Sequence, residues 1–426
     1  MATIILIIGL LNISSVQTFL AKKAASYLSG LLQTEVKVDK VTVSFFDQLE
    51  LKGVFLADQK GDTLLYTKSL GISISNWFFL RPNPTISTIN LDGAVIKMLR
   101  SKNSDEWNYN FIQNAFSNPQ KATARNSEIP KFDVKNVLLQ NVSFLYQDAW
   151  IGVDYKATFE HFEINADKVD VAKKNVVIKS IKGIAPLIGI LEYTGGRPEH
   201  LRKRNKRPYK FSPFNPELWT FEVQKLNLEK GRFYLEYPEK PLHSGRFDEL
   251  HLDVQSIALS AQDIHIQGDT ITGSIIDLQA RDRSGLAVNT MQAKVKVSPN
   301  IAECAQLYLK TDHSILKHYY AMHYQKFPDF IDYIEKVKMV GKLSASTVGM
   351  KDIVLFTDVL DHIKEQKILI SGEGVGTVAA LKTSNLDVYD GINRFKGNLN
   401  LIGIPDVEEM FLESDHFNLV TAGSAM

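Results

Sequence analysis

The chain has 426 residues, of which 44% are hydrophobic and 23% charged, so its composition is that of folded protein and its length allows two or three domains. Its 49 basic residues against 48 acidic ones give a net charge of +1, which offers no overall electrostatic attraction for nucleic acid. The single cysteine, Cys304, excludes an intramolecular disulfide and is expected to be a small buried hydrophobic residue.

The N-terminus opens on an uncharged apolar run, TIILIIGLLNI at residues 3–13. This run is too short to span a bilayer, which takes about 20 apolar residues, and no basic residues precede it as they would in a secretory signal. We interpret residues 1–14 as an incomplete signal anchor. The alternative is a buried N-terminal helix or strand.

Residues 15–34 follow with the spacing of an amphipathic helix. This helix could lie on a membrane surface or cover the end of a sheet, and the sequence favours neither. The apolar positions that define its apolar side are Val16, Phe19, Leu20, Tyr27, Leu28, Leu31 and Leu32.

From residue 35 to the end the apolar residues alternate with polar ones, which predicts a mostly β chain. Strand-like runs bounded by Gly, Asn and Asp recur throughout. Only a few short helices are predicted, at residues 107–116, 314–322 and 328–336.

A strand, a break and a second strand form a unit that recurs at residues 46–56, 86–96, 134–144 and 223–233. The breaks fall at Gly53, Gly93, Asn141 and Lys230, and the alternation of apolar residues changes phase at each. A β-bulge or a tight turn would produce this change while keeping the apolar residues on one face. The uneven spacing of the units indicates a repeated supersecondary unit with insertions rather than a strict solenoid.

A sheet with one apolar face must cover that face, and the predicted helices are too few to do so. The sheet must therefore pack on another sheet, close into barrels, or curl about its own apolar face. Only the last arrangement leaves an apolar interior open along its length.

Three segments resemble the AsmA-like and TamB family of proteins. The first is the N-terminal stretch VQTFLAKKAASYLSGLLQTEVKVDKVTVSFFDQLELKGV at residues 16–54, which follows the apolar run and is similar to the N-terminus of that family. ISTINLDGAVIKMLRSKNSDEWNYNF at residues 86–111 is similar to a family segment in which strand, glycine break and strand lead into an acidic turn and a Trp-Asn pair. GTVAALKTSNLDVYDGINRFKGNLNLIGIPD at residues 376–406 is similar to the TamB pattern that ends in a Gly-Leu-Pro-Asp turn, with Ile404 in place of leucine. TamB proteins are longer and end in a C-terminal domain that this sequence lacks, so it resembles their N-terminal portion.

The resemblance implies an elongated, curled β-sheet that forms a taco-like apolar groove in a periplasmic protein anchored in the inner membrane. It also implies a role in outer-membrane biogenesis: assisting translocation and assembly of outer-membrane proteins beside an outer-membrane barrel partner of the TamA type, or conducting phospholipid. Acyl chains would bind such a groove because each buried methylene contributes about 0.8 kcal/mol. The alternative from another class is a β-sandwich scaffold or adhesion protein of the cell envelope without a lipid groove.

Parity along the strands assigns the candidate groove-lining residues to Leu51, Leu91, Leu139, Leu228 and Phe233. A basic stretch at residues 197–210 is interrupted by prolines and is expected to be a loop, either solvated or in contact with an anionic surface. Its candidate contact residues are Arg202, Lys203, Arg204, Lys206 and Arg207.

No motif supports catalysis, a cofactor or a metal. The glycines of ISGEGVGT at residues 370–377 match neither a dinucleotide nor a phosphate-loop fingerprint and are better explained by a curved strand. His313, His318 and His323 are five residues apart, which would not bring them to one side of a helix as metal ligands, so we expect surface or capping histidines. The sequence predicts a non-enzymatic protein.

Overall fold

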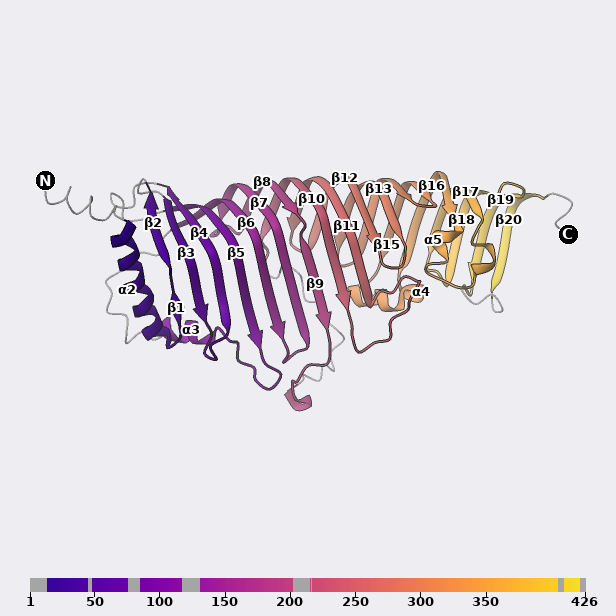
Figure 1. Ribbon diagram of the computed structural model, residues 1–426. Helices are drawn as coiled ribbons and strands as arrows, with labels where there is room; N and C mark the ends of the chain where they lie inside the picture. Colours follow the sequence, from indigo (N-terminus) through magenta and orange to yellow (C-terminus); the bar gives the residue numbers. More distant parts are fainter. Residues whose placement is uncertain are drawn as a thin grey trace. The chain divides into compact units, whose positions relative to one another are not determined.

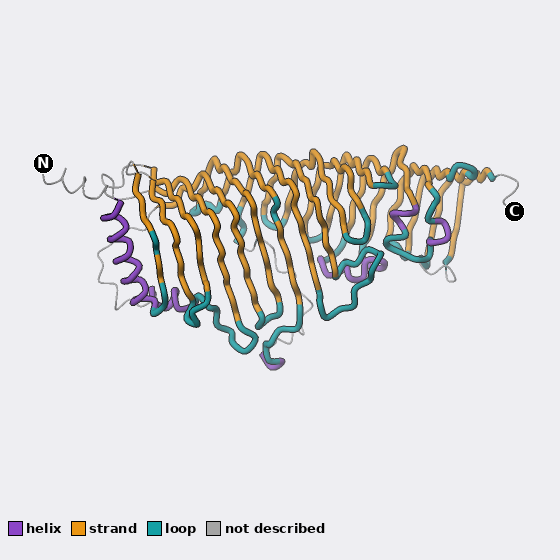
Figure 2. The backbone as a smooth tube through the Cα atoms, viewed as in Figure 1, coloured by secondary structure: helices purple, strands orange, loops and turns teal. Residues whose placement is uncertain are grey.

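The computed structural model describes residues 14–44, 48–75, 85–116, 131–201, 215, 217–404 and 410–421. The chain is mostly β with a few short helices, as predicted (Figure 2). It divides into two compact units, and the predicted repetitive domain at residues 35–426 contains strands of both. Unit 1 comprises residues 1–173, 177–204 and 228–241, and unit 2 comprises residues 174–176, 205–227 and 242–426.

Unit 1 is a sheet whose successive strands pair mainly in antiparallel fashion. Parallel pairs in this unit include β5 with β6 and β9 with β10. The described residues of this unit include the helices α2 (Ser14–Leu32) and α3 (Asn110–Phe116) and the 3-10 turn η2 (Glu199–Leu201). Its strands are β1 (Val36–Lys37), β2 (Lys40–Ser44), β3 (Gln48–Ala57), β4 (Thr63–Ser75), β5 (Thr85–Arg100), β6 (Lys131–Asp148), β7 (Val153–Asp170), β8 (Asn175–Ile184), β9 (Leu187–Glu192) and the second half of β10 (Thr220–Glu236).

A left-handed residue interrupts each strand that carries a predicted break. Gly53, Gly93, Asn141 and Lys230 have φ angles of 61°, 60°, 51° and 54°. Pairing continues on both sides of the break, because Lys52 pairs with Ser69 and Val54 with Thr67. The break therefore reverses the alternation without ending the strand, as the repeated unit predicts. We call these positions the break line.

Helix α2 lies along β1 and β2 at one end of the unit 1 sheet (Figure 1). Its polar side chains bond to the backbone of these edge strands. The Gln17 amide accepts from the Val43 N–H at 2.9 Å and donates to the Val43 carbonyl at 3.4 Å, and the Ser29 hydroxyl makes the same two contacts with Val36 at 2.9 and 3.2 Å. These bonds satisfy backbone groups that an edge strand would leave unpaired.

The helix therefore covers the end of a sheet, which was one of the two interpretations of residues 15–34. Its contact side coincides only in part with the apolar side that the spacing defines, because Leu32 is buried. Phe19 and Tyr27 belong to that apolar side and are 59% and 71% exposed, while Gln17 is buried.

Unit 2 is a run of antiparallel strands with short helical insertions. Its helical segments are η3 (Phe327–Asp332), α4 (Tyr333–Lys336), α5 (Met350–Ile353) and η4 (Asp361–Ile363). Its strands are β11 (His251–Gln267), β12 (Thr270–Asp282), β13 (Ala287–Ser298), β14 (Ile301–Thr311), β15 (Ile315–His323), β16 (Lys338–Gly349), β17 (Lys367–Gly376), β18 (Ala380–Tyr389), β19 (Arg394–Ile402) and β20 (Phe411–Val420).

The predicted helix at residues 314–322 is wrong, because this segment is strand β15. His318 has a φ of 104° and lies at a register shift between β14 and β15, where Ala305 pairs with Tyr319 and Leu307 with His318. The extra residue of this bulge is Gln306 of β14, and the positive φ of His318 opposite it interrupts the alternation of β15, whose apolar residues therefore lack a clean period of two. The predicted helix at 328–336 is confirmed as η3 and α4, and the one at 107–116 is limited to α3.

Residues 324–337 fold back on one face of the unit 2 sheet. Tyr320 and Met322 lie on the same side of β15, and the Tyr333 hydroxyl reaches the Tyr320 hydroxyl at 3.1 Å and the Met322 sulfur at 3.9 Å. Val337, at the end of the insertion, is completely buried. We call the η3 and α4 segment the cover of unit 2.

Candidate functional site: the apolar face of unit 1

A ladder of apolar side chains crosses unit 1 from strand to strand. Register pairs each member with the next, so that all of them share one face of the sheet. This row, row 2, consists of Val41, Leu51, Leu70, Leu91, Leu139 and Phe162.

Leu228 extends row 2 to β10. A methyl group placed on Gly183 of β8 would meet Leu228 at 2.9 Å and Phe162 at 3.0 Å, so both side chains overlie this glycine. The structure thus places four of the five predicted groove-lining residues, Leu51, Leu91, Leu139 and Leu228, in one row.

Other rows run beside row 2 on the same face. Row 1 lies two residues from it on each strand and consists of Val43, Leu49, Ile72, Ile89, Val137 and Ile164. Beyond the break line, row 4 consists of Leu56, Leu65, Ile96, Phe144, Ala157, Ile188 and Phe233, which includes the fifth predicted residue. Row 5 consists of Met98, Tyr146, Tyr155, Ile190 and Leu235.

Aromatic contacts join the two sides of the break line. Phe162 belongs to row 2, and Phe159 pairs with Val142 on the far side of the break. Their ring centroids are 4.8 Å apart, so both rings are on one face. The rows therefore form a single surface, which we call the apolar face of unit 1.

Row 3, which lies beside the break line and includes Val54, Thr67 and Ala94, is buried at Thr67 and Ala94, whereas the other rows of the apolar face are neither buried nor fully exposed. All members of rows 1 and 2 except Val41 are half-buried, although they lie in the interior of the sheet. In rows 4 and 5, Ile188 is 48% and Tyr155 is 45% exposed. A second layer packed on this face would bury these side chains almost completely, as it does in a sandwich core.

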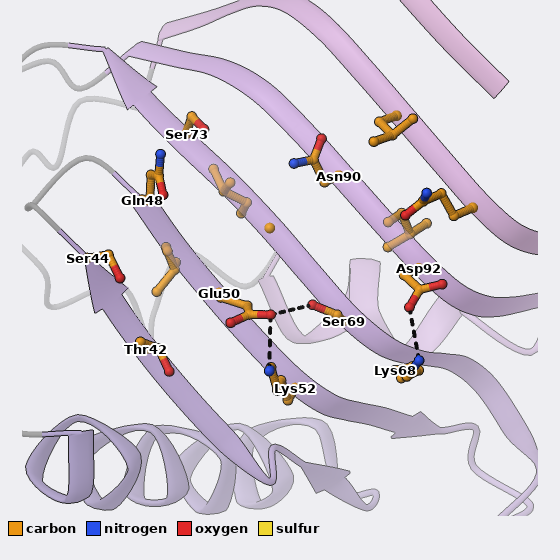
Figure 3. Close-up of a pocket in the computed structure, with 16 residues that line it drawn as sticks. Thr42, Ser44, Gln48, Glu50, Lys52, Lys68, Ser69, Ser73, Asn90 and Asp92 are labelled. Carbon is orange, nitrogen blue, oxygen red and sulfur yellow. Dashed lines mark hydrogen bonds and ion pairs between the residues drawn. The ribbon is translucent and has the colours of Figure 1, made fainter. Parts of the chain in front are cut away.

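Where rows 1 and 2 lie, the opposite face of the same strands is mainly polar (Figure 3), whereas beyond the break line it carries Phe55, Tyr66 and Val95. A hollow of about 530 Å³ lies on it, and its charges pair with each other. Glu50 meets Lys52 at 3.4 Å and accepts from the Ser69 hydroxyl at 3.1 Å, and Lys68 meets Asp92 at 3.4 Å. We interpret this side as the solvated face of the sheet.

A buried ion pair closes one end of the apolar face, where the parallel strands β5 and β6 both end. The Arg100 Nε donates to the Asp148 carboxylate at 2.7 Å, and Asp148 is completely buried. The guanidinium lies 4.8 Å from the centre of the Trp107 ring, which in turn lies 4.6 Å from the Tyr146 ring. The hydrogen bond to Asp148 raises the pKa of Arg100 further above its ordinary value.

Asn108 holds the segment that carries Trp107 in place. Its side chain accepts from the Leu99 N–H at 2.9 Å and donates to the Lys97 carbonyl at 3.1 Å, which extends the edge of β5. Trp107 and Asn108, the Trp-Asn pair that contributes to the family resemblance, therefore have a structural role in this chain. Nearby, burial and a 2.9 Å hydrogen bond to Asp154 raise the pKa of Tyr193 to about 12, so this phenol stays protonated.

Several sequence-based predictions fall elsewhere. Residues 1–13, the predicted anchor, and the basic residues Arg202, Lys203, Arg204, Lys206 and Arg207 lie outside the described residues. Gly372 and Gly376 belong to β17 with φ angles of 136° and 152°, consistent with an irregular strand rather than a phosphate loop. His318 and His323 are exposed. Within the described ranges, no cluster of His, Cys, Asp and Glu is arranged to hold a metal.

Sequence reasoning missed row 1 and the Arg100–Asp148 pair. Row 1 had a sequence signal, because the repeated unit places an apolar residue two positions before each of the four predicted groove leucines, as at Leu49 and Ile89. The ion pair had no sequence signal, since its partners are 48 positions apart and meet only because β5 and β6 run in parallel.

Searches against family models, curated proteins and solved structures gave no match. Among the described helices, none has both the length and the apolar character needed to cross a bilayer.

Proposed function

We propose that this chain is a non-catalytic envelope protein whose apolar face forms a groove for the acyl chains of phospholipids. The observation that carries the proposal is the set of in-register apolar rows that remain half-buried across β3 to β7. An acyl chain on such a surface gains about 0.8 kcal/mol for each methylene removed from water. A continuous row offers similar contacts at each strand, so a chain can shift along it without a deep pocket.

The alternative function, a β-sandwich scaffold, requires these rows to be buried. In a sandwich, a second sheet would consume the apolar side chains and leave no surface for a ligand. The half-burial of Leu70, Leu91 and Leu139 favours an accessible surface over a closed core.

The cellular setting that we propose rests on the resemblance to the TamB family. In this setting, the chain is anchored in the inner membrane and extends into the periplasm. There it serves outer-membrane biogenesis, by conducting phospholipid or by supporting outer-membrane protein assembly with a barrel partner of the TamA type.

Photo-crosslinking from neighbouring residues on opposite faces tests the lipid proposal. Benzoylphenylalanine at Leu139 should crosslink to phospholipid in cells, whereas the same group at Gln140, which faces the polar side, should not. The pair Leu91 and Asn90 provides a second comparison on β5. The crosslinked mass identifies the lipid.

Equal crosslinking from both faces, or none from either, would contradict the proposal. Crosslinking of Leu139 to a protein instead of a lipid would favour the assembly role. Leu91→Asp combined with Leu139→Asp should abolish lipid crosslinking at a third position in the same row, Leu70, because a carboxylate is costly against an acyl chain.

A further inference from the structure

The solvent-facing side of α2 carries side chains that do not take part in its contacts with the sheet. The opposite side is held to β1 and β2 by Gln17, Thr18 and Ser29, so the orientation of the helix is set. The side turned to solvent carries Phe19 and Tyr27, which are 59% and 71% exposed.

The charges on this helix are all of one sign. Lys22 and Lys23 are both exposed, and the sequence Ser14–Leu32 contains no acidic residue. The Lys23 ammonium lies 5.4 Å from the centre of the Phe19 ring, so cation and ring share one patch. We call Phe19, Lys22, Lys23 and Tyr27 the outer patch of α2.

We propose that the outer patch of α2 docks on the surface of an anionic bilayer. Aromatic rings beside lysines are the composition of helices that lie in the headgroup region, where the rings enter the apolar boundary and the ammonium groups meet anionic lipids. Charge complementarity selects an anionic surface, because the patch has two cations and the helix no anion.

This inference goes beyond the proposed function and stands on different residues. The bonds of α2 to β1 and β2 would place the edge of the unit 1 sheet at the bilayer. Row 2 begins at that edge with Val41, whose N–H donates to Thr18 of the helix at 3.4 Å. Docking could fail while acyl chains still crosslink at Leu139, so the two proposals can be distinguished.

The test measures the depth of single positions in the full chain, because residues 3–13 could hold the chain on vesicles by themselves. In a Cys304→Ala background, a fluorophore is attached at Tyr27→Cys, and its quenching by nitroxide lipids is measured in phosphatidylcholine vesicles with and without phosphatidylglycerol. The control is the same fluorophore at Phe356→Cys, a position in unit 2 that is 57% exposed. The Tyr27 label should be quenched strongly on anionic vesicles and the Phe356 label should not.

The charge dependence is tested with Lys22→Gln and Lys23→Gln together. Each lysine near an anionic surface contributes about 1 kcal/mol, so the double change should weaken local docking roughly 30-fold. It should bring the Tyr27 signal to the level seen on neutral vesicles. Equal quenching at Tyr27 and Phe356, or no response to the lysine changes, would overturn the proposal.

Discussion

Both units contain strands that are interrupted by left-handed residues, but their apolar faces differ in how far other segments cover them. In unit 1 the rows around Leu91 stay half-buried, and α2 contacts the sheet at its edge strands. In unit 2 the insertion between β15 and β16 folds back, so that Tyr333 covers Tyr320 and Met322. Burial raises the pKa of Tyr320 strongly, as expected for a phenol removed from water. The difference shows that a connecting segment can cover part of such a face, here at Tyr320 and Met322.

Introducing a carboxylate should give the largest difference in stability loss between the two apolar faces. Val337→Asp places a carboxylate where the native side chain is completely buried, so we expect unit 2 to lose at least about 4 kcal/mol of unfolding free energy. Leu91→Asp on the half-buried face of unit 1 should cost no more than about 2 kcal/mol. Urea denaturation followed by hydrogen exchange of each unit measures both. Equal losses would mean that the two faces are equally closed.

The ion pair that closes the unit 1 face should give the next largest effect. Asp148→Ala leaves the Arg100 guanidinium, whose side chain is only 17% exposed, without its partner and should cost about 3 kcal/mol. The matched control is Asp92→Ala on the polar face, where Lys68 is 75% exposed, and it should cost less than about 1 kcal/mol. Chemical denaturation of both variants checks this ranking, and a similar cost for the two would contradict it.

Substitutions at two positions of the break line should have opposite effects on stability. Gly93→Ala should cost about 1–2 kcal/mol, because alanine is strained at a φ of 60° and its methyl group would lie 3.0 Å from the Lys68 Cβ. Lys230→Gly should be neutral or stabilise by up to about 1 kcal/mol, since a lysine already bears that strain at a φ of 54°. Thermal unfolding of the two variants tests this contrast. If Gly93→Ala were harmless, the left-handed break would not be needed.

The smallest predicted effect is a pH dependence confined to unit 2. Hydrogen bonds from Arg394 and Lys396 hold the pKa of Asp387 at about 2, below its ordinary value. A depressed carboxyl pKa stabilises the fold above the unfolded pKa, so this contribution is present near neutral pH and is lost as the pH falls towards about 2. The effect is small because the pair is solvated on β18 and β19. The acid-induced loss of stability should be slightly smaller in Asp387→Asn than in the native chain.

The fold was predictable to the extent that local residues carry it. The alternation of apolar residues predicted the strands, and glycine or asparagine marked the breaks at Gly53, Gly93 and Asn141. The same left-handed conformation occurs at Gln306 and Ala345, where no such residue marks it. These bulges are imposed by register shifts against neighbouring strands, which the local sequence does not record.

The sequence by itself determined a mostly β chain with interrupted strands, because side-chain alternation and the conformational freedom of glycine act over a few residues. Only the tertiary structure decided which rows align, that Arg100 meets Asp148, and which side of α2 meets the sheet. Each of these depends on partners that lie far apart along the chain, and their contacts exist only when strand register is set. The orientation of α2 shows the reason directly. Unpaired backbone groups at the edge of β2 selected the polar side of the helix over its aromatic side, since hydrogen bonds left unmade there would cost more than exposed rings.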